Sequence, residues 1–361
     1  MLNKIKKGLA VSMAVAMMAV CFTGCGEEKL DSAETVAVVD GEEIPMGVAA
    51  MYTRNEQAKM YNMYTMYFGT ASIFDQIYDQ ESMQTYGEMM KTDVMETLQK
   101  LYVLKAHAAD YGVELTDEEA AEIDAAAKAF AEANADVLDD IGTSEEAVAE
   151  LLSLYKYEAK MTEAMSADVD TNVTEEEAAR SKVTYIRVSL EGTEKDADGN
   201  TIELTADQKK ERADWAADVL DKVLAAEDPA TADWDAIAKE VDESLFASEY
   251  TFSTYDEEDN VLDEAVKAEI KGLADGTVVD KVIVTSDEKT LYVVRFDAEV
   301  DEEATAKQKE NIIATRKGED FQAELEEWIA ASAFSVVDAA WDKVSINDSN
   351  VYLNFHPEDA E

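Results

Sequence analysis

The sequence predicts an α+β protein in which a mostly helical body is interrupted by a small antiparallel sheet with flanking helices. Before residue 182 and after residue 298, apolar residues recur mainly at the three- and four-residue spacing of amphipathic helices. Between these positions, segments follow in the order strand, helix, helix, strand, helix, strand, strand. We therefore expect a helical region over 25–181, a module over 182–298 and a helical return over 299–361 that completes the body.

The first 24 residues have the pattern of an export signal. Lysines at positions 4, 6 and 7 precede an apolar run over 9–22, and small residues then lead to Cys25. The phrase Phe-Thr-Gly-Cys resembles a bacterial lipobox; an ordinary signal peptide with a stray cysteine is the alternative. The lipobox resemblance implies that Cys25 is acylated and anchors the protein to the extracytoplasmic face of the cell membrane without spanning it.

The charge of the chain restricts its partners. The formal net charge is −50, and removal of the three signal lysines lowers it to −53. Such a chain repels nucleic acid, whose binding requires clustered Lys and Arg. Its negative charge favours the binding of basic or neutral polypeptides. The alternative is that the charge serves solubility alone. Cys21 leaves with the signal, so the mature chain has no intrachain disulfide and depends on core burial.

Residues 36–68 predict a short strand, a turn at Asp40 and Gly41, and a long helix with Pro45 at its first position. This region is rich in methionine, since nine of the fifteen methionines lie between 46 and 95. Thioether side chains adapt to irregular apolar shapes, which suits the binding of varied polypeptide segments. The candidate contact residues are Met51, Met60 and Met63; the alternative is that each is an ordinary core residue.

Residues 92–165 predict a series of further helices. Gly112 is expected to end one helix, Thr116 to start the next, and Thr143 to cap the following one. The phrases VAVVDGEEIP and GVELTDEEA resemble the helical chaperone domain of SurA-type and PrsA-type foldases. His107 is expected to be a packed or half-exposed helix residue, because a lone histidine is poor evidence for a metal site. Near the C-terminus, WDKVSINDSNVYLNF is expected to supply a final strand beside residues 36–39.

The module over 182–298 resembles a parvulin-type prolyl isomerase domain in its order of elements and in the phrases IAKEV, GLADGTVVDKVIV and LYVVRF. The family carries a histidine on the first strand and another on the last, with a cysteine or aspartate beside them. The resemblance places Tyr185 and Tyr292 at the two histidine positions, and the cysteine or aspartate position near Glu243 or Ser244. It places the apolar proline slot at Phe252, Leu262 and Val266.

The resemblances imply a membrane-anchored foldase that binds unfolded or newly exported polypeptides. With both histidines replaced, its isomerase site is expected to be degenerate, either weak or silent. A solute-capture or adaptor lipoprotein of the cell envelope is the alternative, although only 14 glycines and 3 prolines argue against a two-lobed solute-binding chain. No cofactor is expected, since GLADGT lacks the lysine and spacing of a phosphate-binding loop. Two histidines in the whole chain give no basis for a metal site.

Overall fold

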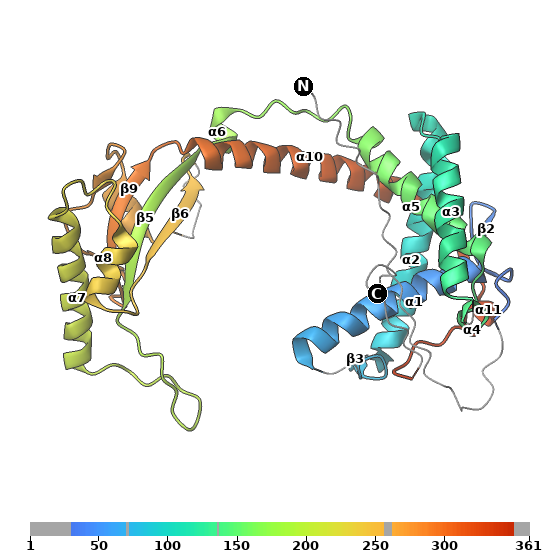
Figure 1. Cartoon of the computed structure of the whole chain (residues 1–361), viewed down its shortest axis with the longest axis horizontal. Helices are drawn as coiled ribbons and strands as arrows, with labels where there is room; N and C mark the ends of the chain where they lie inside the picture. The colour runs from blue at the N-terminus through green and yellow to red at the C-terminus, as the bar shows by residue number, and fades with distance from the viewer. Residues whose placement is uncertain (1–29, 70–71, 136, 256–261, 350–361) are drawn as a thin grey trace. The chain divides into compact units, whose positions relative to one another are not determined.

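The computed structural model describes residues 30–69, 72–135, 137–255 and 262–349 (Figure 1). They form two compact units. Unit 1 comprises the described residues up to 168 and from 318 onwards, and unit 2 comprises those within 169–317. Helices dominate, and every sheet is small and antiparallel, so the predicted α+β class is confirmed. Within the described residues, no helix is long and apolar enough to cross a membrane.

Unit 1 contains a three-stranded sheet of order β10-β1-β2, formed by β1 (Thr35–Val39), β2 (Glu42–Pro45) and β10 (Phe334–Val336). The predicted turn is present, with φ of 50° at Asp40 and 90° at Gly41. Strand β2 was not expected. It makes Pro45 the last strand residue and the N-cap of the next helix, so the prediction that Pro45 is the first helical residue is wrong by one position.

The predicted C-terminal strand is also misplaced. The partner of β1 is β10, in register Val39↔Phe334, whereas Asp338–Trp341 form helix α11 and the described residues after it are not a strand. The physical reason is a contact between residues that are far apart in the sequence. The Asp40 amide donates to the Ala333 carbonyl at 2.9 Å, and the Asp40 carboxylate accepts from the Ala333 amide at 2.7 Å. The β1–β2 turn therefore captures the chain just before Phe334. Residues 350–355 lie outside the described residues.

The helices of unit 1 bury one continuous apolar core. Its largest fully buried side chains include Leu98, Leu101, Leu104, Leu151 and Leu154, which recur at helical spacing in two of the helices. The remaining elements of the unit are α1 (Met46–Phe68), β3 (Ile77–Asp79), β4 (Gln84–Thr85), α2 (Tyr86–His107), η1 (Ala108–Tyr111), α3 (Asp117–Ala133), α4 (Leu138–Ile141) and α5 (Glu145–Met165).

Local signals set most of these helix boundaries. Gly112 follows η1 at φ 65°, and Thr116 caps α3 in a capping box, both as predicted. Helix α5 is capped by Ser144, so the prediction of Thr143 is wrong. The Thr143 hydroxyl donates instead to the buried Gly47 carbonyl at 2.9 Å, because tertiary packing places α1 beside it. His107 is a packed helix residue as predicted, stacked on Trp328 at 4.1 Å.

Unit 2 contains a five-stranded antiparallel sheet of order β6-β5-β9-β7, with β8 also paired to β9. The predicted order of elements is present, with one additional short strand, β7. The elements are α6 (Glu175–Ala178), β5 (Arg180–Ser189), α7 (Ala206–Leu224), α8 (Trp234–Val241), β6 (Ala247–Ser253), α9 (Glu264–Ile270), β7 (Thr277–Val278), β8 (Ile283–Val284) and β9 (Thr290–Ala298).

The two faces of this sheet pack against different helices (Figure 1). Ile186 and Val293 point to the face covered by α7 and α8, where Trp234 is buried. Val183 and Val294 point to the opposite face, which packs on α9. Strand alternation therefore separates the residues of β5 and β9 into two apolar clusters. The cluster beneath α9, here called the α9 cluster, contains the residues that the sequence assigns to the proline slot.

Helix α10 (Glu302–Ala331) is a single helix of 30 residues. The division between the units falls within it, between Lys317 and Gly318, and again between Asp168 and Val169. Both boundaries differ from residues 182 and 298. Arg316 supplies a reason, since its guanidinium donates to the carbonyls of Asp170 and Asn172 at 3.1 and 3.2 Å and pairs with Glu177. These bonds connect the stretch before β5 to the first part of α10.

Candidate functional site

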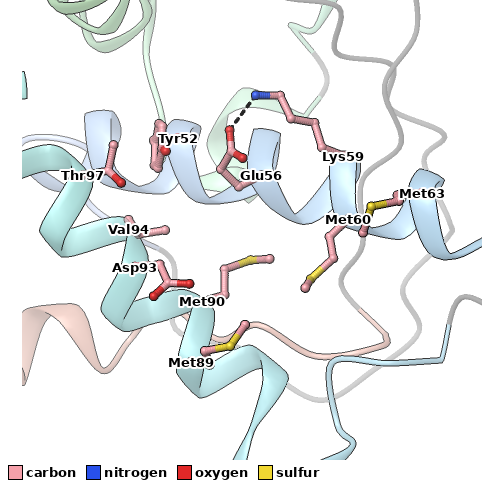
Figure 2. Close-up of a pocket in the computed structure, with 10 residues that line it drawn as sticks. All are labelled: Tyr52, Glu56, Lys59, Met60, Met63, Met89, Met90, Asp93, Val94 and Thr97. Atoms are coloured by element: carbon pink, nitrogen blue, oxygen red, sulfur yellow. Dashed lines mark hydrogen bonds and ion pairs between the residues drawn. The ribbon is translucent and has the colours of Figure 1, made fainter. Parts of the chain in front are cut away.

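A groove lies between α1 and α2 in unit 1 and encloses a cavity of about 330 Å³ (Figure 2). Four methionines line it, two from each helix, and Figure 2 shows them gathered at one end, with Tyr52 and Thr97 at the other. We call this feature the methionine groove. Its lining residues are Tyr52, Glu56, Lys59, Met60, Met63, Met89, Met90, Asp93, Val94 and Thr97.

The opposite face of α1 explains why the groove remains open on this side. Arg54 is buried and donates to the Ser345 carbonyl at 2.8 Å, while the Gln57 amide donates to the Asn347 carbonyl at 3.2 Å. The C-terminal segment of unit 1 thus packs on that face of α1. Tyr52, Glu56 and Met60 recur every four residues on a different face of α1, and they line the groove.

The structure separates the three predicted methionines. Met51 is fully buried in the core of unit 1, so it cannot contact a ligand in this conformation. Met60 is half-buried, and Met63 is 45% exposed; both line the groove. Met89 and Met90, which belong to the predicted methionine-rich region but were not among its candidate contact residues, complete the lining. Their position near the start of a second amphipathic helix was the available signal.

Next to the groove, the end of α1 and the β3–β4 hairpin expose further apolar side chains. Met66, Tyr67 and Phe68 are each about 70% exposed. Of the fourteen large apolar side chains that are exposed among the described residues, seven lie between positions 63 and 83. We call the six beyond Met63 the apolar tip: Met66, Tyr67, Phe68, Ile77, Tyr78 and Met83. Clusters of exposed large apolar side chains are a common feature of interaction sites, so the apolar tip is a candidate site.

The electrostatics of the groove are uneven. The Glu56 carboxylate accepts from the Lys59 ammonium at 2.7 Å, so one carboxylate has a cation beside it. Asp93 is exposed on α2 and makes no hydrogen bond or ion pair with the rest of the described chain. Burial raises the pKa of the Tyr52 phenol; a hydrogen bond with Thr97 opposes this, and the nearby Glu56, Glu158 and Asp93 carboxylates raise it further. Glu158 is paired with Lys100 and Glu56 with Lys59, so Asp93 is the lining carboxylate that has no ion-pair partner in the described chain.

In unit 2, the structure brings the two predicted tyrosines together. Tyr185 on β5 and Tyr292 on β9 meet edge to face, with ring centroids 5.5 Å apart. They are diagonal neighbours, since Tyr185 lies opposite Val294 and Tyr292 opposite Arg187. Burial raises the pKa of the Tyr292 phenol, and the Arg187 guanidinium partly opposes the shift. The pair provides two hydrogen-bonding hydroxyl groups at the edge of the α9 cluster.

The predicted slot residues also join the α9 cluster, but mostly as core. Val266 is fully buried and Leu262 is 5% exposed, whereas Phe252 is half-buried. A cavity of about 790 Å³ lies beside Phe252, Ile270 and Phe296, and neither Leu262 nor Val266 lines it. In this structure Leu262 and Val266 are thus covered by neighbouring side chains, and the open space lies beside Phe252.

Ser244 lies apart from this arrangement. It is exposed in the loop after α8, where its hydroxyl and amide both donate to the Asp242 carboxylate, at 2.5 and 2.9 Å. The serine opposite Tyr185 in the sheet is Ser248. Sequence reasoning missed both Ser248 and Arg187. The two-residue period of a strand places Arg187 on the face of Tyr185, and this signal was available.

Two further points concern the predicted lipid anchor and possible metal ligands. Cys25 lies outside the described residues. Among the residues that are described, no group of three or more His, Cys, Asp or Glu side chains is arranged to hold a metal ion.

Comparisons with known proteins give similarity at the level of structure. No protein-family model and no curated protein matches the chain. The foldase protein PrsA from Streptococcus pneumoniae str. Canada MDR_19A is 19% identical, with 71% of this chain and 91% of that chain covered and a TM-score of 0.28. The peptidylprolyl isomerase PrsA from Bacillus anthracis is 13% identical, with 64% and 96% covered and a TM-score of 0.25. Both of these solved structures, to which the chain is similar, are PrsA proteins.

Proposed function

We propose that this protein is an extracytoplasmic, membrane-anchored foldase that holds unfolded exported polypeptides in unit 1. The observation that carries the proposal is the methionine groove continuing into the apolar tip. Unit 2 would be a parvulin-like module with weak or no isomerase activity. The lipid anchor is supported by the sequence around Cys25 alone.

Client binding follows from the chemistry of the groove. An unfolded polypeptide exposes apolar side chains, and their burial against an apolar surface is favourable by roughly 25 cal/mol per Å². Methionine side chains are flexible and polarizable, so Met60 and Met63 can follow clients of different shape. A surface of this kind binds many sequences with moderate affinity, as a foldase requires.

Isomerase activity is expected to be low because Leu262 and Val266, the two slot residues on and before α9, are buried and do not line the cavity beside Phe252. Rotation about an X–Pro bond crosses a barrier of roughly 20 kcal/mol that arises from amide resonance. An enzyme lowers this barrier by holding a twisted amide in a pocket that excludes water. Here Leu262 and Val266 are packed against their own neighbours. Two phenols can still hydrogen-bond to a bound peptide, which would leave Tyr185 and Tyr292 as the centre of any residual activity.

The test is suppression of aggregation of chemically unfolded client proteins, measured by light scattering with the purified protein. The double variant Met60→Ser, Met63→Ser should bind clients roughly tenfold more weakly, since apolar burial at two positions is lost. Leu224→Ser is the matched control, because Leu224 is 43% exposed on α7 and lies outside the groove. A double variant that remains folded and protects clients as well as the unchanged protein would refute the proposal.

The same assay separates a foldase from an adaptor of the cell envelope. An adaptor would use the groove for one fixed partner and would leave unrelated clients to aggregate. Protection of several clients of different sequence, lost together in the Met60 and Met63 variant, supports the foldase.

A further inference from the structure

We propose that the methionine groove selects client segments in which a large apolar side chain lies within one or two residues of a lysine or arginine. The inference rests on the proposed function, since it names the chemistry of the segment that the groove holds. It goes beyond the binding of apolar side chains, because it proposes that the carboxylates of the lining bind a lysine or arginine of the client.

The lining places an apolar and an acidic surface side by side. Figure 2 shows Met60 and Met90 reaching into the groove from facing helices, with the carboxylate of Asp93 one turn away on α2. Glu56 lies across the groove on α1. The lining carries two carboxylates and one ammonium, that of Lys59. An apolar client side chain among the methionines therefore brings its neighbours within reach of Asp93 and Glu56.

Both carboxylates are available to a client cation. Asp93 has no ion-pair or hydrogen-bond partner in the described part of the chain. Glu56 is paired with Lys59, but this is an i,i+3 pair whose lysine side chain is 56% exposed. Exposed pairs of this kind contribute little, so a client arginine or lysine can replace Lys59 at little loss.

The apolar walls make this charge more effective than a carboxylate on an open face. A low-dielectric surface beside a charge strengthens its interaction with an opposite charge and reduces screening by salt. Burial is the first cause of the raised pKa of the Tyr52 phenol, and the Glu56 and Asp93 carboxylates of the lining raise it further. Client segments rich in acidic residues are also disfavoured by the net charge of −50 on the chain.

The experiment compares three fluorescein-labelled nonapeptides with the same central phenylalanine and leucine, flanked by arginine, glutamine or glutamate. Fluorescence anisotropy at low ionic strength measures their affinity for the purified full chain. We expect the arginine peptide to bind most tightly and the glutamate peptide most weakly. Asp93→Asn should weaken the arginine peptide roughly threefold and leave the glutamine peptide unchanged.

Asp124→Asn is the matched control. Asp124 is exposed on α3 of unit 1, outside the lining of the groove, and its change alters the net charge by the same amount. It should leave all three affinities unchanged. An equal effect of the two variants would show that the net charge acts at a distance, and would overturn the inference.

The outcomes distinguish this inference from the proposed function. If the arginine and glutamine peptides bind equally, and Met60→Ser, Met63→Ser weakens both, the basic preference is wrong while client binding in the groove stands. If no peptide binds, or if the Met60 and Met63 variant binds all of them normally, the proposed site and the inference both fail.

Discussion

Truncation of Val266 to alanine tests whether the α9 cluster is a packed core or a substrate slot. Val266 is fully buried and packs with Leu262, Ile270 and Val294. The change removes two methyl groups, each worth about 0.8 kcal/mol on burial, and leaves a cavity that adds to the loss. We therefore expect the free energy of unfolding of unit 2 to fall by about 2 kcal/mol.

Amide hydrogen exchange is the appropriate assay, because it reports the opening of unit 2 separately from that of unit 1. Peptides from β5 and β9 should exchange roughly thirtyfold faster in Val266→Ala under conditions where opening is at equilibrium. Val284→Ala is the matched control. Val284 is 47% exposed on β8, so its change should alter the opening free energy by less than about 0.5 kcal/mol.

A different result would refute the reasoning. If Val266→Ala leaves exchange in β5 and β9 unchanged but weakens the binding or turnover of an X–Pro peptide, then Val266 contacts substrate. The slot would then open in solution, and the expectation of low isomerase activity would lose its main support.

Three other changes test separate parts of the molecule. The pKa of Glu119 is lowered to about 2, first of all by a hydrogen bond from Lys160. Its contribution to the free energy of unfolding is therefore present above about pH 4.5 and is lost as the pH falls towards 2. In Glu119→Gln, the free energy of unfolding measured across that range should depend less on pH. Changing Cys25 to Ala should release the protein from membranes or stall its processing, and a variant that stays membrane-bound and is processed normally would contradict the lipid anchor. In a protease-coupled assay on a short X–Pro peptide, the purified protein should isomerise the peptide slowly, and more slowly still in a Tyr185→Phe, Tyr292→Phe double variant. An isomerisation rate typical of an active parvulin, unchanged by the two substitutions, would contradict the assignment of the isomerase site to these tyrosines.

Features encoded within a few residues could be predicted from the sequence. The capping box at Thr116 depends on a side chain and an amide three residues apart, and the stop at Gly112 depends on a backbone conformation that glycine favours. The long helices followed from apolar spacing alone. The contact between Tyr185 and Tyr292 also followed from pattern, because strand alternation places both side chains on one face once their strands are neighbours.

Strand partners and the choice between core and surface depended on contacts between distant residues. Phe334 rather than a later segment pairs with β1, because the Asp40 turn captures Ala333 nearly three hundred residues further along the chain. Sequence spacing could not have supplied that register, since both candidate segments have strand-like composition.

The methionines show the same limit within one helix. Met51 and Met63 have the same side chain and the same apolar surroundings in sequence, yet one is buried and the other is 45% exposed. The many apolar residues of α1 predicted that part of its surface would be buried against other elements of the protein. The packing of α2, α5 and the C-terminal segment against α1 decided which face was covered, because burial depends on what other elements bring into contact.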